Sequence, residues 1–73
     1  MEKKMEVFGE RLKTLRKERK LTQKAMAELL DVTERHYQSM ESGAVNVPSL
    51  TLLFLADLFN VSTDYLLGRS EEK

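Results

Sequence analysis

The stretch LTQKAMAELLDVTERHYQSMESG, residues 21–43, predicts two short helices with three residues between them. Thr22 suits the N-cap of the first helix, and Thr33 suits the N-cap of the second. Gly43 stands where a left-handed residue would end the second helix. The buried face of the first helix is expected to consist of Ala25, Met26, Leu29 and Leu30.

The short spacer between the two helices fixes how they meet. With only Asp31, Val32 and Thr33 between them, the helices must cross at a steep angle. Ala27 is compatible with a close crossing because its side chain is small, and Val32 would pack under the turn. Asp31 can occupy the turn because aspartate visits left-handed conformations. This is the helix-turn-helix arrangement, whose second helix enters the DNA major groove.

The second helix of the pair has two unlike sides. Tyr37, Met40 and Glu41 recur at spacings of three and four residues and are expected to face the protein, with the Tyr37 hydroxyl reaching the rim of the core. The opposite side carries Glu34, Arg35, Gln38, Ser39 and Ser42. Its mixed donors and acceptors could match base edges in a major groove, whereas a merely solvated face would be richer in Lys and Glu. An ordinary polar face is the alternative interpretation.

The flanking sequence completes an all-α pattern. Apolar residues at helical spacing predict a helix over residues 5–19, which Gly9 weakens, and the stretches at 49–59 and 63–67 predict two more. Asn60 and Gly68 suit the helix ends, and Ser62 suits an N-cap. We therefore expect one domain over residues 1–73, a compact five-helix bundle with its core at about 6–68 and a polar, frayed tail at 69–73.

Composition argues against several classes of protein. The chain has no cysteine and one histidine, His36, so we expect no metal site and no cofactor. No nucleophile-and-base set or phosphate-binding glycine loop is present, which argues against an enzyme. The longest apolar run, Leu52–Ala56, is too short for a membrane span, and the N-terminus lacks the apolar core of a signal peptide. The expected location is the cytoplasm, with the nucleoid.

Charge is unevenly distributed although the formal net charge is zero. Residues 1–24 contain nine basic and four acidic residues, a net charge of +5, and Lys3 and Lys4 are among the nine. Residues 25–73 carry a net charge of −5. One part of the molecule could therefore face a polyanion while the other faces away, although a solvated helix surface gives the same pattern.

The quoted stretch resembles the helix-turn-helix core of the Cro/XRE-type, phage-repressor-like DNA-binding family. The flanking FGERLKTLRKERK and LFLADLFNVSTDYLL agree with it, and the likeness covers about residues 8–68. The features at family spacing are LTQ, Ala27, the Glu-x-Gly of residues 41–43, the Leu-Ala of residues 55–56 and the Val-Ser of residues 61–62. The resemblance implies a lambda-repressor-like fold of five helices and, usually, a symmetric homodimer on a palindromic operator.

Site residues follow partly from this resemblance and partly from residue chemistry. The resemblance implies groove-facing or base-contacting roles for Thr33, Glu34, Arg35 and Ser39, a phosphate contact and a bracing role for Gln23, and a place near a phosphate for Ser42. It also implies an internal ion pair between Arg16 and Glu41, which we interpret as structural. Side-chain chemistry favours Arg35 for a bidentate contact to guanine and leaves Gln38 open to an adenine edge or a phosphate. Further phosphate candidates are Thr22, Lys24, His36 and Asn46.

Two expectations concern the surface. The loop AVNV, residues 44–47, lacks the basic residues that this family often has there, which predicts a shallow salt dependence of DNA binding. Phe54 and Leu58 form a second apolar stripe on the fourth helix, which indicates a dimer interface or packing against the last helix. Tyr65, Leu66 and Leu67 could join that interface.

These patterns predict a transcriptional regulator that binds a double-stranded DNA operator sequence-specifically through the helix starting at Thr33. Repression is the expected mode, and no small-molecule ligand or membrane partner is evident. Two alternatives stay open: an antitoxin-type regulator that also binds a toxin, and a protein-interaction module on the same fold.

Overall fold

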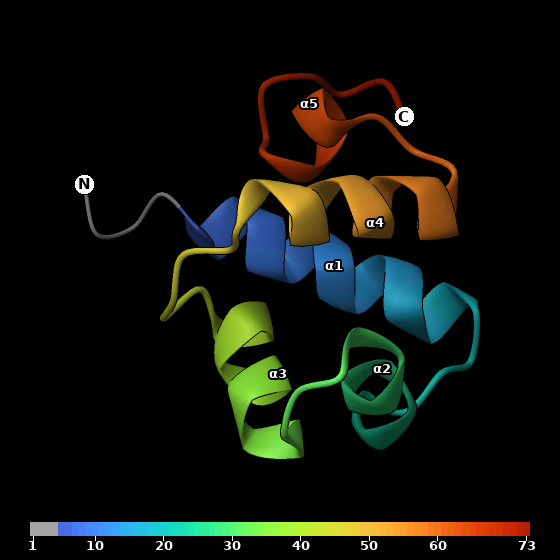
Figure 1. The fold of residues 1–73 in the computed structure, drawn as a ribbon. Helices are drawn as coiled ribbons and strands as arrows, with labels where there is room; N and C mark the ends of the chain where they lie inside the picture. Colours follow the sequence, from blue (N-terminus) through green and yellow to red (C-terminus); the bar gives the residue numbers. More distant parts are fainter. Residues whose placement is uncertain (1–4) are drawn as a thin grey trace.

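Five α-helices and no strands make up the part of the chain that the structure, a computed structural model, describes, residues 5–73 (Figure 1). The helices are α1 (Met5–Glu18), α2 (Gln23–Leu30), α3 (Glu34–Ser42), α4 (Ser49–Phe59) and α5 (Thr63–Leu66). The predicted all-α five-helix fold is confirmed. Lys3 and Lys4, which contribute to the basic N-terminal charge, lie outside the described residues. Among residues 5–73 no helix is long and apolar enough to cross a membrane.

Local chemistry begins and ends most of these helices. The side chains of Thr22, Thr33 and Ser62 each accept a hydrogen bond from the backbone N–H three residues further on, at 3.0, 3.0 and 2.9 Å. The helices α2, α3 and α4 end at residues in the left-handed conformation, with φ of 59° at Asp31, 80° at Gly43 and 56° at Asn60. The boundaries of the two helices in residues 21–43 therefore follow the sequence prediction.

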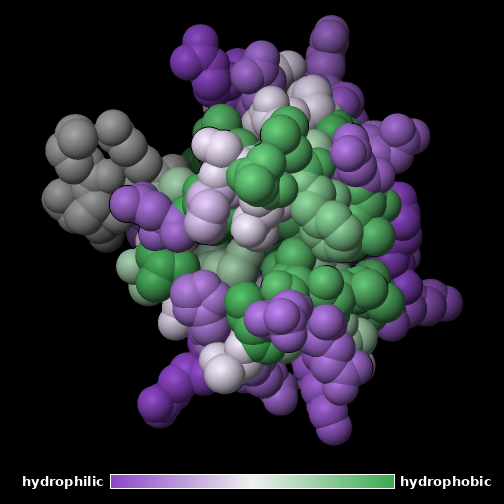
Figure 2. Space-filling view, viewed as in Figure 1, coloured by the Kyte–Doolittle hydropathy of each residue, from purple (hydrophilic) through white to green (hydrophobic). Residues whose placement is uncertain are grey.

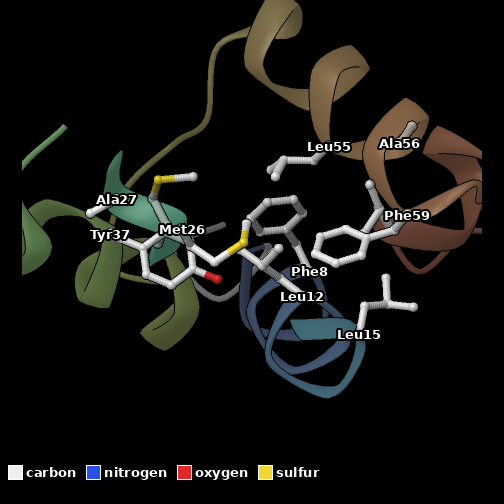
Figure 3. Packing of buried hydrophobic residues seen from close by; sticks show 11 residues of the cluster. Phe8, Leu12, Leu15, Met26, Ala27, Tyr37, Leu55, Ala56 and Phe59 are labelled. Carbon is white, nitrogen blue, oxygen red and sulfur yellow. The ribbon is translucent and has the colours of Figure 1, made fainter. Parts of the chain in front are cut away.

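One apolar core joins the five helices. Figure 3 shows Phe8 of α1 beside Leu55 and Phe59 of α4, with Met26 and Tyr37 toward α2 and α3. The buried apolar residues are Phe8, Leu12, Leu15, Met26, Ala27, Tyr37, Met40, Leu55, Ala56, Phe59 and Leu66.

Two apolar residues lie elsewhere than expected. Leu29 was assigned to the buried face of α2 but is 50% exposed, because Met26 and Ala27 supply the buried contacts of that short helix. Leu66, expected at a dimer interface, is completely buried. Since α5 is a single turn, Leu66 is the residue through which it enters the core, and it cannot form part of an exposed interface.

Gly9 allows α1 and α3 to approach closely. A Cβ atom at this position would lie 2.2 Å from the carbonyl oxygen of Glu41, far inside van der Waals contact. Helix propensity alone predicts only that Gly9 weakens α1. Its structural role is to leave room for the backbone of α3 at Glu41.

The C-terminal tail is docked against α1, contrary to the expectation of a frayed end. Arg11 donates hydrogen bonds to the carbonyl oxygens of Tyr65 and Ser70, at 2.5 and 2.6 Å, and pairs with Glu71 at 3.2 Å. Its guanidinium also lies 4.2 Å from the centroid of the Tyr65 ring. The carbonyl oxygen of Lys73 accepts a hydrogen bond from the Ser62 N–H at 2.8 Å. A single arginine thus organises residues 65–71.

Candidate nucleic-acid interface

The pair α2 and α3 has the steep crossing that the three-residue spacer predicts. In Figure 1 α2 is seen almost along its axis, whereas α3 runs down the page beside it. The turn is closed by the N–H of Val32, which donates to the carbonyl oxygen of Ala27 at 3.0 Å. Val32 packs against the core and Ala27 is 3% exposed. Because α3 also packs against α1, it is held rigidly at one edge of the molecule.

The inner side of α3 is built from the residues that were expected there. Tyr37, Met40 and Glu41 are all buried. The Tyr37 hydroxyl does not reach the rim, however: it donates a hydrogen bond of 2.6 Å to Oε2 of Glu41 inside the molecule. A buried hydroxyl needs a partner, and the neighbouring carboxylate one turn further along the helix provides it.

The outer side of α3 is polar and open to solvent. Glu34, Arg35, Gln38 and Ser42 are exposed, and Ser39 is half-buried between them and the protein. The hydroxyl of Ser42 donates to the Ser39 carbonyl oxygen at 2.9 Å, within the last turn of the helix. Thr33 is exposed as well, with its hydroxyl accepting the capping hydrogen bond. The structure therefore brings the five predicted base-contacting residues together on α3 and its N-cap.

A buried ion pair ties the inner side of α3 to α1. Arg16 Nε lies 2.5 Å from Oε2 of Glu41, and Nη2 donates to Oε1 at 3.3 Å. The two side chains are only 9% and 4% exposed. Arg16 also donates to the carbonyl oxygen of Leu21 at 2.8 Å, so it reaches the start of the α2 region too. The expected internal pair is thus a fork that positions α1, α2 and α3 together.

Protonation equilibria at this pair favour its charged form. Burial works to raise the pKa of Glu41, but hydrogen bonds from Arg16, Tyr37 and Gln23 outweigh it and hold that pKa below its ordinary value. The hydrogen bond to Glu41 raises the pKa of Arg16 although burial opposes it. Burial, followed by the bond to the carboxylate, raises the pKa of Tyr37 far above the usual range. Glu41 is therefore ionised and Tyr37 is a neutral donor near neutral pH.

Gln23 connects this buried pair to the exposed side of α3. Its Nε2 donates to Oε1 of Glu41 at 3.1 Å, and its Oε1 accepts from Nε2 of Gln38 at 3.2 Å. The side chain therefore braces α2 against α3. Its outward atom is an acceptor, which a phosphate oxygen would not bind. A phosphate contact at Gln23 would accordingly use the backbone N–H groups at the start of α2.

The other predicted phosphate-contacting residues lie around the ends of α2 and α3. Thr22 and Lys24 are exposed at the start of α2. His36 and Asn46, also exposed, both line a pocket of about 110 Å³, together with Met40 and Val47. That pocket places the residues after α3 next to the flank of α3, a proximity that residue spacing alone does not reveal.

Few positive charges lie in this region. The exposed charged residues between 22 and 46 are two bases, Lys24 and Arg35, and three acids, Glu28, Asp31 and Glu34. Lys13, Lys17 and Lys20 are exposed on and after α1. The exposed charges of the helix pair are therefore nearly balanced, with three acids to two bases.

An apolar surface on α4 differs in detail from the predicted stripe. Phe54 is 42% and Leu67 37% exposed, whereas Leu58 and Tyr65 are half-buried against the core. The most exposed apolar residues of α4 are Leu50 at 81% and Leu53 at 52%, and neither belongs to the predicted stripe. Figure 2 shows hydrophobic residues gathered across the middle of this face, over the position of α4 in Figure 1.

Comparisons with known proteins agree with this geometry. A family model described as a helix-turn-helix domain matches residues 9–72. The uncharacterized HTH-type transcriptional regulator YqaE of Bacillus subtilis is 43% identical over 68 residues, which are 92% of this chain and 59% of that protein. The HTH-type transcriptional regulator ImmR of the same organism is 43% identical over 64 residues, 88% of this chain and 50% of that protein. This chain thus spans only about half of each relative.

A solved structure shares the fold. The restriction-modification controller protein C.AhdI from Aeromonas hydrophila superimposes with a TM-score of 0.72 at 29% sequence identity. The match covers 85% of this chain and 94% of the controller protein.

Proposed function

We propose that this chain, which belongs to the Cro/XRE-type helix-turn-helix family, binds double-stranded DNA sequence-specifically as the reading domain of a transcriptional regulator. The observation that carries the proposal is the exposed polar side of α3, which a steep crossing and a buried ion pair hold at one edge of the molecule. A helix presented in this way fits a major groove, and its mixed donors and acceptors suit base edges.

The proposed roles follow from side-chain chemistry and position. Arg35 makes a bidentate contact to guanine O6 and N7, and Glu34 accepts from a cytosine amino group. Thr33 and Ser39 contact the groove at either end of this set. Contacts to phosphate, which position the protein without reading sequence, come from Thr22, Gln23, Lys24, His36, Ser42 and Asn46.

A homodimer on a palindromic operator is the arrangement we propose for binding. Two copies related by a twofold axis would present two α3 helices about 34 Å apart, one turn of DNA. The exposed apolar residues Leu50, Leu53, Phe54 and Leu67 offer a surface for that contact. Occupying such an operator would repress transcription by excluding polymerase, and the DNA partner would place the protein with the nucleoid.

Selection of bound duplexes from a random pool tests the function. We expect enrichment of a palindrome whose half-sites are centred about one helical turn apart and contain guanine. Recovery of unenriched sequences, with affinity equal for all duplexes, would contradict sequence-specific binding. Sedimentation tests the dimer separately: a Phe54→Lys variant that sediments as the parent does would remove the support for this interface.

A further inference from the structure

A chain of hydrogen bonds runs from the buried ion pair to the exposed surface of α3. Arg16 and the Tyr37 hydroxyl both donate to Glu41. Gln23 Nε2 donates to the same carboxylate at 3.1 Å, and Gln23 Oε1 accepts from Gln38 Nε2 at 3.2 Å. Gln38 is exposed, so the chain ends at the candidate DNA-reading face.

The buried carboxylate fixes the direction of every bond in this chain. An ionised carboxylate only accepts hydrogen bonds, so Gln23 must turn its NH₂ group inward and its carbonyl oxygen outward. That oxygen in turn requires the NH₂ group of Gln38. A flip of either amide would set two donors or two acceptors against each other, which costs about the desolvation of an unpaired polar group. Gln38 therefore keeps its carbonyl oxygen, Oε1, and the second N–H of Nε2 free for a contact outside the protein.

The neighbouring residues extend this polarity along the helix. Glu34 lies one turn before Gln38 on the same side of α3, is exposed and also accepts only. Arg35 and Ser39 are likewise four residues apart and supply donors. The outer side of α3 thus presents the acceptor oxygens of Glu34 and Gln38 beside Arg35, which only donates, and Ser39, whose hydroxyl donates and accepts.

We propose that Gln38 reads one base of each half-site through this fixed acceptor, taking a hydrogen bond from an exocyclic amino group and selecting adenine above cytosine, guanine and thymine. Adenine N6 and cytosine N4 are the amino donors in the major groove, whereas guanine and thymine present acceptors there. Adenine is preferred because the second N–H of Gln38 Nε2 can also donate to its N7. Gln23 and Tyr37 act as positioning residues, since they orient the amide without touching the base. This inference rests on the proposed DNA-binding function.

The experiment measures base preference in the full chain. The duplex enriched by selection is substituted symmetrically with each of the four bases at every half-site position, and affinities are measured by fluorescence anisotropy at one salt concentration. We expect one position at which the parent prefers adenine to guanine and thymine by about fivefold or more, the low end of a good base contact. In Gln38→Ala that preference falls to within about twofold, and the preferences at other positions are retained.

A second variant separates the orientation of Gln38 from its mere presence. Gln23→Met keeps the length of the side chain but removes both amide contacts, while Arg16 and Tyr37 still satisfy Glu41. Gln38 is then free to rotate its amide, so we expect the preference for adenine over guanine and thymine to fall to about half or less of the parental ratio. A phosphate contact through the backbone N–H of residue 23 is retained in this variant, and any small change in it would affect all four bases equally and leave this ratio unchanged.

Thr14→Ala, an exposed change on α1 at a residue that takes no part in these hydrogen bonds, is the matched control and should reproduce the parental ratios. If Gln38→Ala leaves every base preference unchanged, or Gln23→Met leaves the adenine ratio unchanged, the proposal is wrong. If the parent itself shows no base preference at any position, the proposed function fails first, which is a distinguishable result.

Discussion

The ion pair between Arg16 and Glu41 makes a quantitative prediction about stability. Arg16→Met preserves the length of the side chain but leaves the Glu41 carboxylate buried without its cation. Removing one partner of a buried pair typically costs about 3–5 kcal/mol. Tyr37 and Gln23 still donate to the carboxylate, so we expect a value near the lower limit, about 3 kcal/mol. The total stability of a domain of this size is on the order of 4–11 kcal/mol, so this single loss is a large share of it.

Urea denaturation followed by circular dichroism at 222 nm measures this loss, and a thermal melt should fall by about 12–24 °C. The pH dependence supplies a second check. Because the folded pKa of Glu41 is lowered, its contribution is complete above the unfolded value of about 4.3 and disappears as pH falls through the folded value. The penalty of Arg16→Met should therefore be largest at neutral pH and shrink in acid, where a protonated Glu41 needs no cation.

Further variants separate the two unpaired groups that could lower stability, the Glu41 carboxylate and the Tyr37 hydroxyl. Replacing both partners in Arg16→Met/Glu41→Met removes the unpaired charge but leaves the Tyr37 hydroxyl without an acceptor. Adding Tyr37→Phe removes that hydroxyl, so the triple variant should be more stable than the double by about 1–3 kcal/mol. A loss below about 1 kcal/mol in Arg16→Met, or a loss independent of pH, would refute the reasoning.

Three more predictions concern packing, the tail and binding. Gly9→Ala should lower the free energy of unfolding, measured by urea denaturation, by about 1–2 kcal/mol, because the added methyl group meets the Glu41 carbonyl oxygen and this overpacking outweighs the gain in helix propensity. Unchanged stability would show that α1 and α3 can move apart to make room for the methyl group. Arg11→Ala should lower the free energy of unfolding by about 1–2 kcal/mol and speed tryptic cleavage after Arg69, because the tail loses the hydrogen bonds from Arg11. The control Lys13→Ala should change neither quantity. Equal cleavage rates in the two variants would mean that Arg11 does not hold the tail. A plot of the logarithm of the DNA-binding constant against the logarithm of salt concentration should have a slope of about −4, which corresponds to about four neutralised phosphates per dimer. A slope near about −10 would contradict the expectation that the helix pair neutralises few phosphates.

The parts of the fold that depend on local chemistry could be predicted from the sequence. Thr22, Thr33 and Gly43 act on backbone groups only a few residues away, so their positions determine where α2 and α3 begin and end. The two sides of α3 also follow from spacing, because Tyr37 and Met40 are its only large apolar residues. These features define the helix pair and its polar outer side.

Features that depend on how distant segments meet could not be predicted in the same way. The α4 sequence is apolar almost all round, so periodicity does not show that Leu50 and Leu53 face outward. A one-turn helix such as α5 has no period at all, which is why Leu66 was misplaced. The contact between Gln23 and Gln38 spans fifteen residues of sequence and exists only because of the angle at which α2 and α3 cross.

The contact between Arg35 and guanine tests the central claim most directly. The selected operator is synthesised with 7-deazaguanine at each guanine in turn, which removes the N7 acceptor, and the affinities of the parent and of Arg35→Ala are compared. We predict one guanine per half-site at which the modification weakens the parent by about 1–3 kcal/mol but leaves Arg35→Ala unaffected, because that variant no longer makes the contact. If both proteins lose the same affinity at every guanine, or if Arg35→Ala binds the operator as the parent does, α3 does not read the major groove in the way described.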